Sequence, residues 1–146
     1  MTVSTDPKIT LEAFDDLVRA GLPFAVAAGF RVEKLGAGTA TCRAPFRADS
    51  IRPGGTIAGP VLMGLADYAL YAVVLSLVGP VRLAVTTSLT TNFLRRPKAA
   101  DVIAEARIIK LGRRLAYGEV MVYSDGDDDP VAHVTGTYSI PPAGVG

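Results

Sequence analysis

Apolar residues occupy nearly every position from Gly59 to Pro80, and Asp67 is the one charged residue in this stretch. Because the apolar positions are not confined to one stripe, the pattern predicts a helix that is buried nearly all round. Pro60 suits the first turn of such a helix, and the Gly79-Pro80 pair ends it. A carboxylate within a buried helix costs free energy unless it is hydrogen-bonded or serves chemistry. Asp67 is therefore the first candidate for a functional residue.

Shorter segments on both sides of this helix follow other patterns. Thr10 is predicted to cap an amphipathic helix that runs to about Ala20 and stops at Gly21. The segment 22–29 is expected to be an apolar connection, and the segment 47–58 a loop rich in glycine and proline. Alternating positions and turn residues predict strands over Phe30 to Leu35, Thr39 to Pro45, Leu83 to Leu94, Val102 to Leu111, Leu115 to Ser124 and Val131 to Ile140.

The order of these elements predicts an α+β fold. One antiparallel sheet with short connections can curl around a long central helix and cover most of its surface. We expect a single domain over residues 1–146, with the short helix near its start. A curled sheet leaves an edge strand, and pairing of two such edges is a direct route to a dimer. In the third predicted strand, alternation predicts one face formed by Val85, Thr87, Leu89, Thr91 and Phe93.

Composition narrows the classes of function. The chain is 49% hydrophobic and 20% charged, which is typical of a globular protein. Its formal net charge of +1 gives no general attraction to nucleic acid. Asp67 near the middle of the long helix, and Gly64 within it, argue against a membrane span. Cys42 is the single cysteine, so an internal disulfide is excluded and a cytoplasmic location is expected.

Five stretches together resemble a known family, in its order and spacing. They are Gly55 to Leu62, Leu65 to Asp67, Asn92 to Arg95, Gly112 to Ala116 and Ala132 to Thr137. The chain resembles the hotdog-fold acyl-CoA thioesterases, in the phenylacetate-degradation (PaaI-like) branch, over about residues 22–140. The resemblance implies a hotdog fold and a homodimer that joins two sheets edge to edge, often paired again into a tetramer. It also implies active sites at the subunit boundary, with the helix of one chain facing the loop of the other.

The sequence departs from this family just before the long helix. The family commonly carries Asn, His and a second Gly where this chain has Arg52, Ala58 and Pro60, whereas Gly59 matches the first Gly and Asp67 matches the acidic residue. Pro60 has no N–H to donate, and Ala58 has no polar side chain. Arg52 is either a cationic donor to the substrate or a solvated loop residue. These three positions are expected to border the substrate.

The resemblance assigns roles for thioester hydrolysis, which needs an activated water or a carboxylate nucleophile and a donor for the oxyanion. Asp67 is the candidate general base or nucleophile; the alternative is a buried structural carboxylate. Gly59 is the candidate backbone donor at the helix N-terminus, or simply a turn glycine. Thr86 occupies a position where related enzymes carry a hydroxyl that orients water, although threonine is also an ordinary strand residue.

Substrate contacts are expected at three further residues. Tyr71, one helical turn after Asp67, is predicted either to hydrogen-bond the carboxylate or to line an acyl pocket, with ordinary packing as the alternative. Arg95 and Arg113 lie in basic turns that suit the phosphates of coenzyme A, unless they form a solvated rim. Apart from coenzyme A as part of the substrate, we expect no cofactor, and no metal.

Three other readings compete with an acyl-CoA thioesterase. The changes at Arg52, Ala58 and Pro60 also fit a hotdog protein that binds acyl-CoA or a small ligand without catalysis. A hotdog dehydratase or hydratase is disfavoured, because His133, the single histidine, has no acidic partner at a recognised spacing. A purely structural homo-oligomer is the fourth reading.

Overall fold

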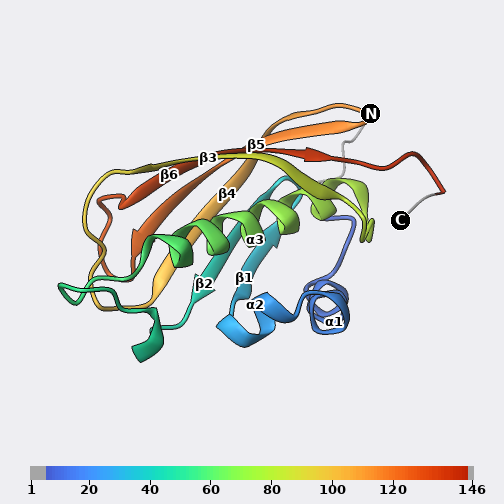
Figure 1. Ribbon diagram of the computed structural model, residues 1–146. Coiled ribbons are helices and arrows are strands. Elements are labelled where there is room, and N and C mark those ends of the chain that lie inside the picture. The colour runs from blue at the N-terminus through green and yellow to red at the C-terminus, as the bar shows by residue number, and fades with distance from the viewer. Residues whose placement is uncertain (1–5, 145–146) are drawn as a thin grey trace.

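The computed structural model describes residues 6–144 and places one long helix against the inner face of a curved sheet (Figure 1). The helices are α1 (Leu11–Gly21), α2 (Pro23–Ala28) and α3 (Gly59–Val78), with a short 3-10 turn, η1, at Ala48–Ser50. The strands are β1 (Arg31–Gly36), β2 (Thr39–Ala44), β3 (Val85–Phe93), β4 (Val102–Leu111), β5 (Leu115–Ser124) and β6 (Ala132–Ser139). The predicted strands and the two predicted helices are confirmed.

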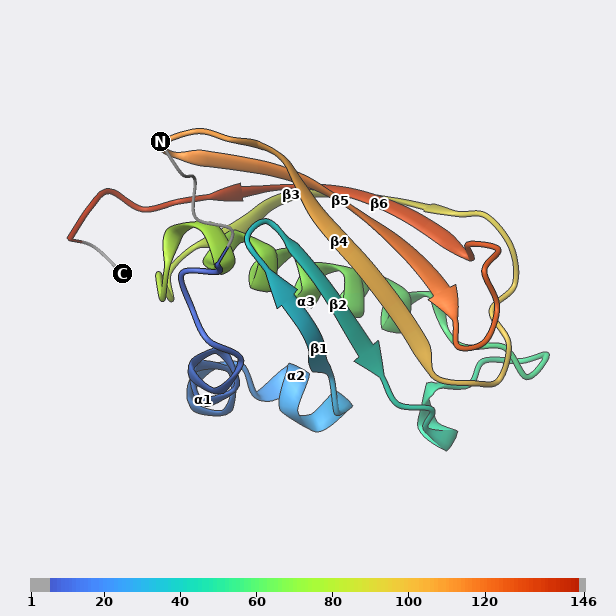
Figure 2. The ribbon, with the colours of Figure 1, turned by 180° about the vertical axis from the view of Figure 1, so that it is seen from behind.

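Within residues 6–144 the strands form one antiparallel sheet in the order β1-β2-β4-β5-β6-β3. β3 follows α3 in the chain yet pairs with β6, so the connection through α3 carries the chain from β2, which is next to one edge, to the opposite edge of the sheet. Both views show α1 and α2 on the side of the β1 edge (Figures 1 and 2). The β3 edge pairs with no further strand of the described chain, as expected for an edge that a second copy can use.

Helix α3 forms the centre of the hydrophobic core. Its side chains pack against the strands on the concave face of the sheet, and most of them are buried, as the uninterrupted apolar pattern predicts. Leu70 marks the point of closest approach, because Gly118 of β5 and Gly136 of β6 lie opposite each other there. A Cβ atom at either glycine would lie within 3 Å of a Leu70 methyl group. Because neither glycine has a side chain, the helix can pack closely against the sheet at these two positions.

The apolar character of α3 is explained by this position. By length and composition α3 would be able to cross a membrane, since an 18-residue window has a mean hydropathy of 2.0. In the structure, 67% of that window is buried inside the fold. The apolar composition of α3 is therefore explained by its burial in the core of the fold.

The two N-terminal helices cover one side of α3. Thr10 caps α1 as predicted, since its Oγ1 accepts a hydrogen bond from the Ala13 N–H at 3.0 Å, and Phe14 is fully buried. The segment that follows differs from the expected irregular connection and forms the short helix α2. Pro23 suits the first turn of α2, and Gly29 ends the helix in the left-handed conformation, with φ of 75°.

A bulge in β3 decides which of its side chains point inward. The ladder with β6 skips Thr87, which lies between the paired residues Thr86 and Ser88. Such an extra residue interrupts the side-chain alternation of a strand. The predicted face that joined Val85 to Leu89 is therefore wrong, because the alternation restarts after the bulge and Val85 is left 57% exposed. Thr86 turns toward α3 instead.

The close approach of Leu70 to β5 generates a stability prediction. In Gly118→Ala the new Cβ would lie 2.8 Å from the Arg107 carbonyl oxygen and 2.9 Å from a Leu70 methyl group. Because a backbone atom cannot move aside cheaply, we expect a loss of about 2 kcal/mol in the free energy of unfolding, measured by urea denaturation. The control is Gly21→Ala at the end of α1, where nothing lies within 4 Å and stability is expected to be unchanged or slightly raised. Equal stability of the Gly118→Ala variant and the wild type would contradict this account of the packing.

Candidate active site

Asp67 lies where α3, β3 and β6 meet. Thr86 of β3 donates a hydrogen bond from Oγ1 to Asp67 Oδ1 at 2.6 Å. The hydroxyl of Tyr138, from β6, lies 2.7 Å from the same Oδ1 and 2.9 Å from the Asp67 carbonyl oxygen. No group of residues 6–144 donates a hydrogen bond to Oδ2. One oxygen of the carboxylate is thus fixed by two hydroxyl groups, and the other is left for a ligand or water.

Local structure explains why these three groups meet. The bulge at Thr87 turns Thr86 toward α3, and Thr86 is directly opposite Tyr138 in the β3–β6 ladder. Tyr138 is only 3% exposed. Burial, together with the negative charge of Asp67, raises the pKa of Tyr138 well above its usual range. The phenol therefore keeps its proton and donates to the carboxylate.

A cavity of about 430 Å³ opens beside Asp67. Tyr71 stacks against Tyr138 in its wall, with ring centroids 6.2 Å apart. The Tyr71 hydroxyl donates to the Arg82 carbonyl oxygen at 2.9 Å, so Tyr71 lines the cavity but does not bond the carboxylate. Phe24 of α2 lies at the cavity and remains 63% exposed. The lining is mainly apolar and aromatic, and it comes from α1, α2, α3, β3 and β6.

A second pocket, of about 440 Å³, lies at the N-terminus of α3. Gly59 is the first residue of α3 and lines this pocket together with Arg52. Ala58 occupies the N-cap position without a side-chain hydrogen bond, and Pro60 lies in the first turn. Gly59 is eight residues from Asp67, which is about 12 Å along the helix axis. Within one chain Gly59 therefore borders a different pocket from Asp67 and Thr86.

The predicted phosphate ligands are also separated within one chain. Arg95 follows β3, lines the pocket at Gly59 and forms ion pairs with Asp127 at 3.3 Å and Asp129 at 2.9 Å. Arg113 lies in the turn between β4 and β5, which the strand register places at the opposite end of the sheet. A single chain does not bring the two guanidinium groups to one site.

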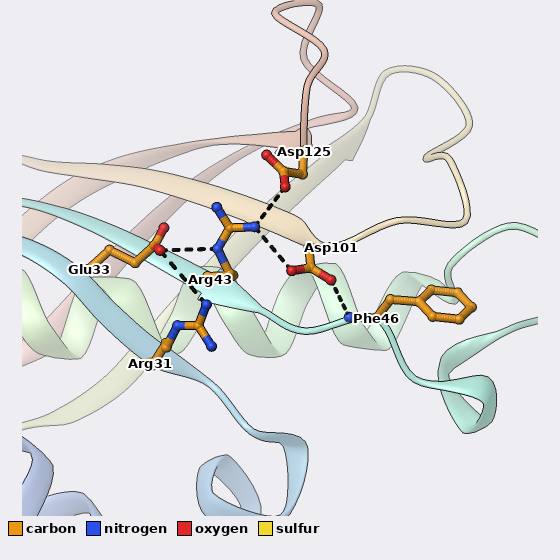
Figure 3. A network of polar contacts seen from close by, with 6 residues as sticks. All are labelled: Arg31, Glu33, Arg43, Phe46, Asp101 and Asp125. Carbon is orange, nitrogen blue, oxygen red and sulfur yellow. Dashed lines mark hydrogen bonds and ion pairs between the residues drawn. The ribbon is translucent and has the colours of Figure 1, made fainter.

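The loop before α3 is attached to the sheet by a charged network (Figure 3). Arg43 of β2 binds the carboxylates of Glu33, Asp101 and Asp125 at 2.8 to 3.1 Å. Asp101 also accepts the Phe46 N–H at 2.7 Å, where the chain leaves β2. This hydrogen bond and the Arg43 guanidinium hold the pKa of Asp101 below its usual range. The network fixes the start of the loop that carries Arg52 and Ala58.

His133 has the acidic partner that its sequence spacing did not reveal. Its Nε2 lies 2.9 Å from Glu119 of β5, which also pairs with Arg107 of β4. The pKa of Glu119 is lowered by His133 first and by Arg107 next. Burial alternates along β6, and His133 points to the face of the sheet away from α3. The hydratase reading stays disfavoured for a different reason, since His133 and Asp67 lie on opposite faces.

No group of three or more His, Cys, Asp or Glu side chains that could hold a metal ion occurs within residues 6–144. Cys42 is fully buried on β2, and its burial raises the pKa of the thiol well above its usual range. It alternates with the buried Ala40 and Ala44 along β2 and is therefore a structural thiol of the core.

Comparison with known proteins identifies the family. The model of the thioesterase superfamily matches residues 54–131, which is more than half of the chain and includes α3 with Asp67. The chain belongs to the thioesterase superfamily, as the resemblance predicts, and is a thioester hydrolase.

Individual relatives agree with this assignment. A crystal structure of a Silicibacter sp. TM1040 protein assigned as a thioesterase is 36% identical, with a TM-score of 0.85 over 94% of this chain and 96% of that one. A variant of the phenylacetic acid degradation protein PaaI from Thermus thermophilus is 35% identical, with a TM-score of 0.72 over 82% of this chain and 99% of that one. A Saccharolobus solfataricus protein assigned as an esterase is 33% identical over 77% of this chain and 73% of its own length. The predicted hotdog fold is confirmed.

Tyr138 is the site residue that sequence reasoning missed. It lies in a strand pattern in which a tyrosine is an ordinary residue. Its contact with Asp67 spans 71 positions of the chain, so no local spacing indicates it. The pairing of β3 with β6 is the signal that would have found it, because it sets Thr86 opposite Tyr138.

The charged network around Asp101 generates a prediction for the pH dependence of stability. Because the pKa of Asp101 is lowered in the folded state, its contribution to stability is present above the unfolded value of about 3.9 and is lost as pH falls through the folded value. We expect the free energy of unfolding of the wild type to fall below about pH 5, and the difference between wild type and Asp101→Asn to shrink toward pH 3. Urea denaturation from pH 7 to pH 3 measures both.

The control for this measurement is Asp128→Asn. Asp128 lies in the exposed turn after β5 and accepts no hydrogen bond from residues 6–144. We expect its substitution to leave both stability and its pH dependence close to those of the wild type. A constant difference between wild type and Asp101→Asn at all pH values would show that the charge of Asp101 does not support the fold.

Proposed function

We propose that the protein hydrolyses the thioester of an acyl-coenzyme A, with Asp67 as the reacting carboxylate. The observation that carries this proposal is the arrangement at Asp67. Thr86 and Tyr138 hold Oδ1, Oδ2 has no donor in the described chain, and Asp67 lines an aromatic cavity. Membership of the thioesterase superfamily supports the thioester as the bond that is cleaved. The cavity suits a small or medium acyl or aryl group.

Two chemical routes use the same oxygen. As a general base, Asp67 Oδ2 takes a proton from water while the water oxygen adds to the carbonyl carbon. Collapse of the tetrahedral intermediate then expels coenzyme A thiolate, which takes up that proton. As a nucleophile, Oδ2 adds to the carbonyl carbon itself, the C–S bond breaks and coenzyme A thiolate leaves, which gives a mixed anhydride. Water then hydrolyses the anhydride, which releases the acid, restores the Asp67 carboxylate and supplies the proton that the thiolate takes up. Thr86 acts through Asp67 in both routes, because its hydroxyl is engaged with Oδ1.

The oxyanion donor in this proposal is the Gly59 N–H of a second copy of the chain. The first N–H groups of a helix have no intrahelical acceptor and carry the positive end of the helix dipole. Gly59 lies at the pocket beside the end of β3, whereas Asp67 lies at the cavity beside its start. An antiparallel two-fold pairing of β3 edges sets the start of one strand beside the end of the other. Asp67 of each chain would then face the helix N-terminus of its neighbour.

Exposed apolar side chains support this pairing. The edge strand and the residues that flank it carry four large apolar side chains that are each more than half exposed, namely Leu83, Val85, Phe93 and Leu94. Apolar patches at an unpaired edge are typical of an interface between subunits. We therefore propose a homodimer, with pairing of dimers into a tetramer left to measurement.

Arginine residues are the candidates for binding the coenzyme A part of the substrate. Arg52, Arg95 and Arg96 line the pocket at Gly59, and guanidinium groups bind phosphates through paired hydrogen bonds. The same two-fold pairing would bring the sheet end that carries Arg113 of one copy beside this pocket of the other. We infer that these residues hold the phosphates of coenzyme A. A carboxylate, water and a backbone N–H suffice for the reaction, so we propose that it needs no cofactor or metal. We also propose that the protein is cytoplasmic, as its single cysteine, Cys42, indicates.

Replacement of the carboxylate tests the enzymatic proposal. In Asp67→Asn the side chain keeps its shape but loses its basic and nucleophilic oxygen. We expect kcat for thiol release to fall by at least about 100-fold, with coenzyme A ester binding retained. The measurement uses a panel of aliphatic and aromatic acyl-coenzyme A esters, together with calorimetric binding, and Asp128→Asn is the matched control.

The alternative outcomes are distinct. If wild type and Asp67→Asn release no thiol but bind coenzyme A esters equally well, the protein is a binding module on this fold. If neither protein binds any of these esters, both the enzymatic proposal and the binding alternative fail.

Isotope labelling separates the two routes. We expect the general-base route, because the hydroxyl groups of Thr86 and Tyr138 fix the Asp67 carboxylate against α3 and leave Oδ2 free to accept a proton from a water. After many turnovers in ¹⁸O-water, mass spectrometry of the peptide that contains Asp67 should show no added label, and hydroxylamine should trap no anhydride. Label in this peptide would establish the nucleophilic route instead.

A further inference from the structure

The Tyr138 hydroxyl occupies a position between two oxygens of one residue. It lies 2.7 Å from Asp67 Oδ1 and 2.9 Å from the Asp67 backbone carbonyl oxygen. The carbonyl belongs to the rigid backbone of α3, so a hydroxyl that bridges it to the side chain restrains the rotation of the carboxylate. Thr86 approaches the same Oδ1 at 2.6 Å from β3. Together the two hydroxyls determine which carboxylate oxygen remains available.

We propose that Tyr138 is a positioning residue that fixes the Asp67 carboxylate so that Oδ2 is its reacting oxygen. This inference rests on the proposed function, in which Asp67 acts on the thioester or on water. A carboxylate must be held in a productive orientation, since a misplacement of 1 Å can cost about 100-fold in rate. The Tyr138 ring is buried at the end of β6 and stacked against Tyr71, so its hydroxyl has little freedom to move away.

Tyr71 makes this inference testable. It is a tyrosine of the same cavity, it stacks on Tyr138, and it also donates one hydrogen bond. Its hydroxyl bonds to the Arg82 carbonyl oxygen at 2.9 Å rather than to the carboxylate. Removal of either hydroxyl deletes one oxygen atom and one hydrogen-bond donor from the same cavity wall. Only the removal at Tyr138 takes a donor away from Asp67.

The titratable and charged groups around Asp67 are few. Those that line the cavity are Tyr68 and Tyr71 from α3, Arg82 before β3, and Tyr138 from β6. The lining residues of α1 and α2 are uncharged. The three tyrosines have pKa values raised chiefly by burial, so they remain neutral where the enzyme is assayed.

The experiment compares Tyr138→Phe with Tyr71→Phe in the full chain. For Tyr138→Phe we expect kcat at the pH optimum to fall about 10-fold with KM changed less than about twofold, because the substrate pocket is intact but the carboxylate keeps only one of its two donors, Thr86. The fall in kcat without a matching change in KM is the result that loss of the substrate pocket would not produce. Tyr71→Phe keeps both donors to Oδ1, so we expect a smaller fall in kcat than in Tyr138→Phe, and any further effect of this cavity residue should fall on KM. Asp128→Asn is the control that is expected to leave kcat and KM close to those of the wild type.

Each result either supports or overturns the assignment. A packing role alone would lower the melting temperature of both variants and lower kcat of both to the same extent; that result overturns the proposal. So does a Tyr138→Phe enzyme with unchanged or raised kcat, since the carboxylate would then orient itself without the tyrosine. If Asp67→Asn is inactive while the two tyrosine variants behave alike, only the positioning role fails. If the wild type hydrolyses no acyl-coenzyme A, the proposed function fails and the positioning role fails with it.

If Tyr138→Phe does not fold, Thr86→Val gives a second measurement. It removes the other donor to Oδ1 without touching β6. Because Tyr138 still bridges Oδ1 to the backbone in this variant, we expect a smaller loss of kcat than in Asp67→Asn. A loss as large as that of Asp67→Asn would mean that Tyr138 contributes nothing to the orientation, and would overturn the proposal.

Discussion

The need to cover the apolar surface of α3 determines the rest of this structure. A helix without a polar stripe has no side that is stable in water, so the sheet must curve around it. The strands and the two N-terminal helices cover α3 on most sides (Figures 1 and 2). Coverage ends along the β3 edge, and Asp67 lies near that edge, bonded to Thr86 of β3. The one charged residue of α3 thus lies where the covering of the helix is incomplete.

The fold could be read from the sequence largely because its signals are local. The apolar run of α3, the cap at Thr10 and the alternation in the later strands each identify an element without reference to the others. The features that were missed depend on tertiary structure. Helix α2 is only six residues long and forms in contact with neighbouring elements, and the bulge at Thr87 appears only when β3 is paired with β6.

The candidate site was predictable in part for the same reason. Asp67 stands out because a charge in an apolar helix is a local anomaly, and the family resemblance pointed to Thr86, which does bond to it. Tyr138 and the Glu119 partner of His133 are contacts between strands, and neither residue carries a distinctive local pattern. The sequence also could not separate Arg95 from Arg113, because both lie in basic turns and only the strand pairing shows that these turns are at opposite ends of the sheet.

The location of the two pockets at opposite ends of β3 has a consequence for how the protein would behave on dilution. Each chain carries a carboxylate at one end of this strand and a helix N-terminus at the other, and neither pocket holds both. Under the proposed pairing, an isolated folded chain would contain two half-sites and no complete one. Specific activity would then depend on protein concentration and would be lost near the dissociation constant of the dimer, while the fold of each subunit remained intact.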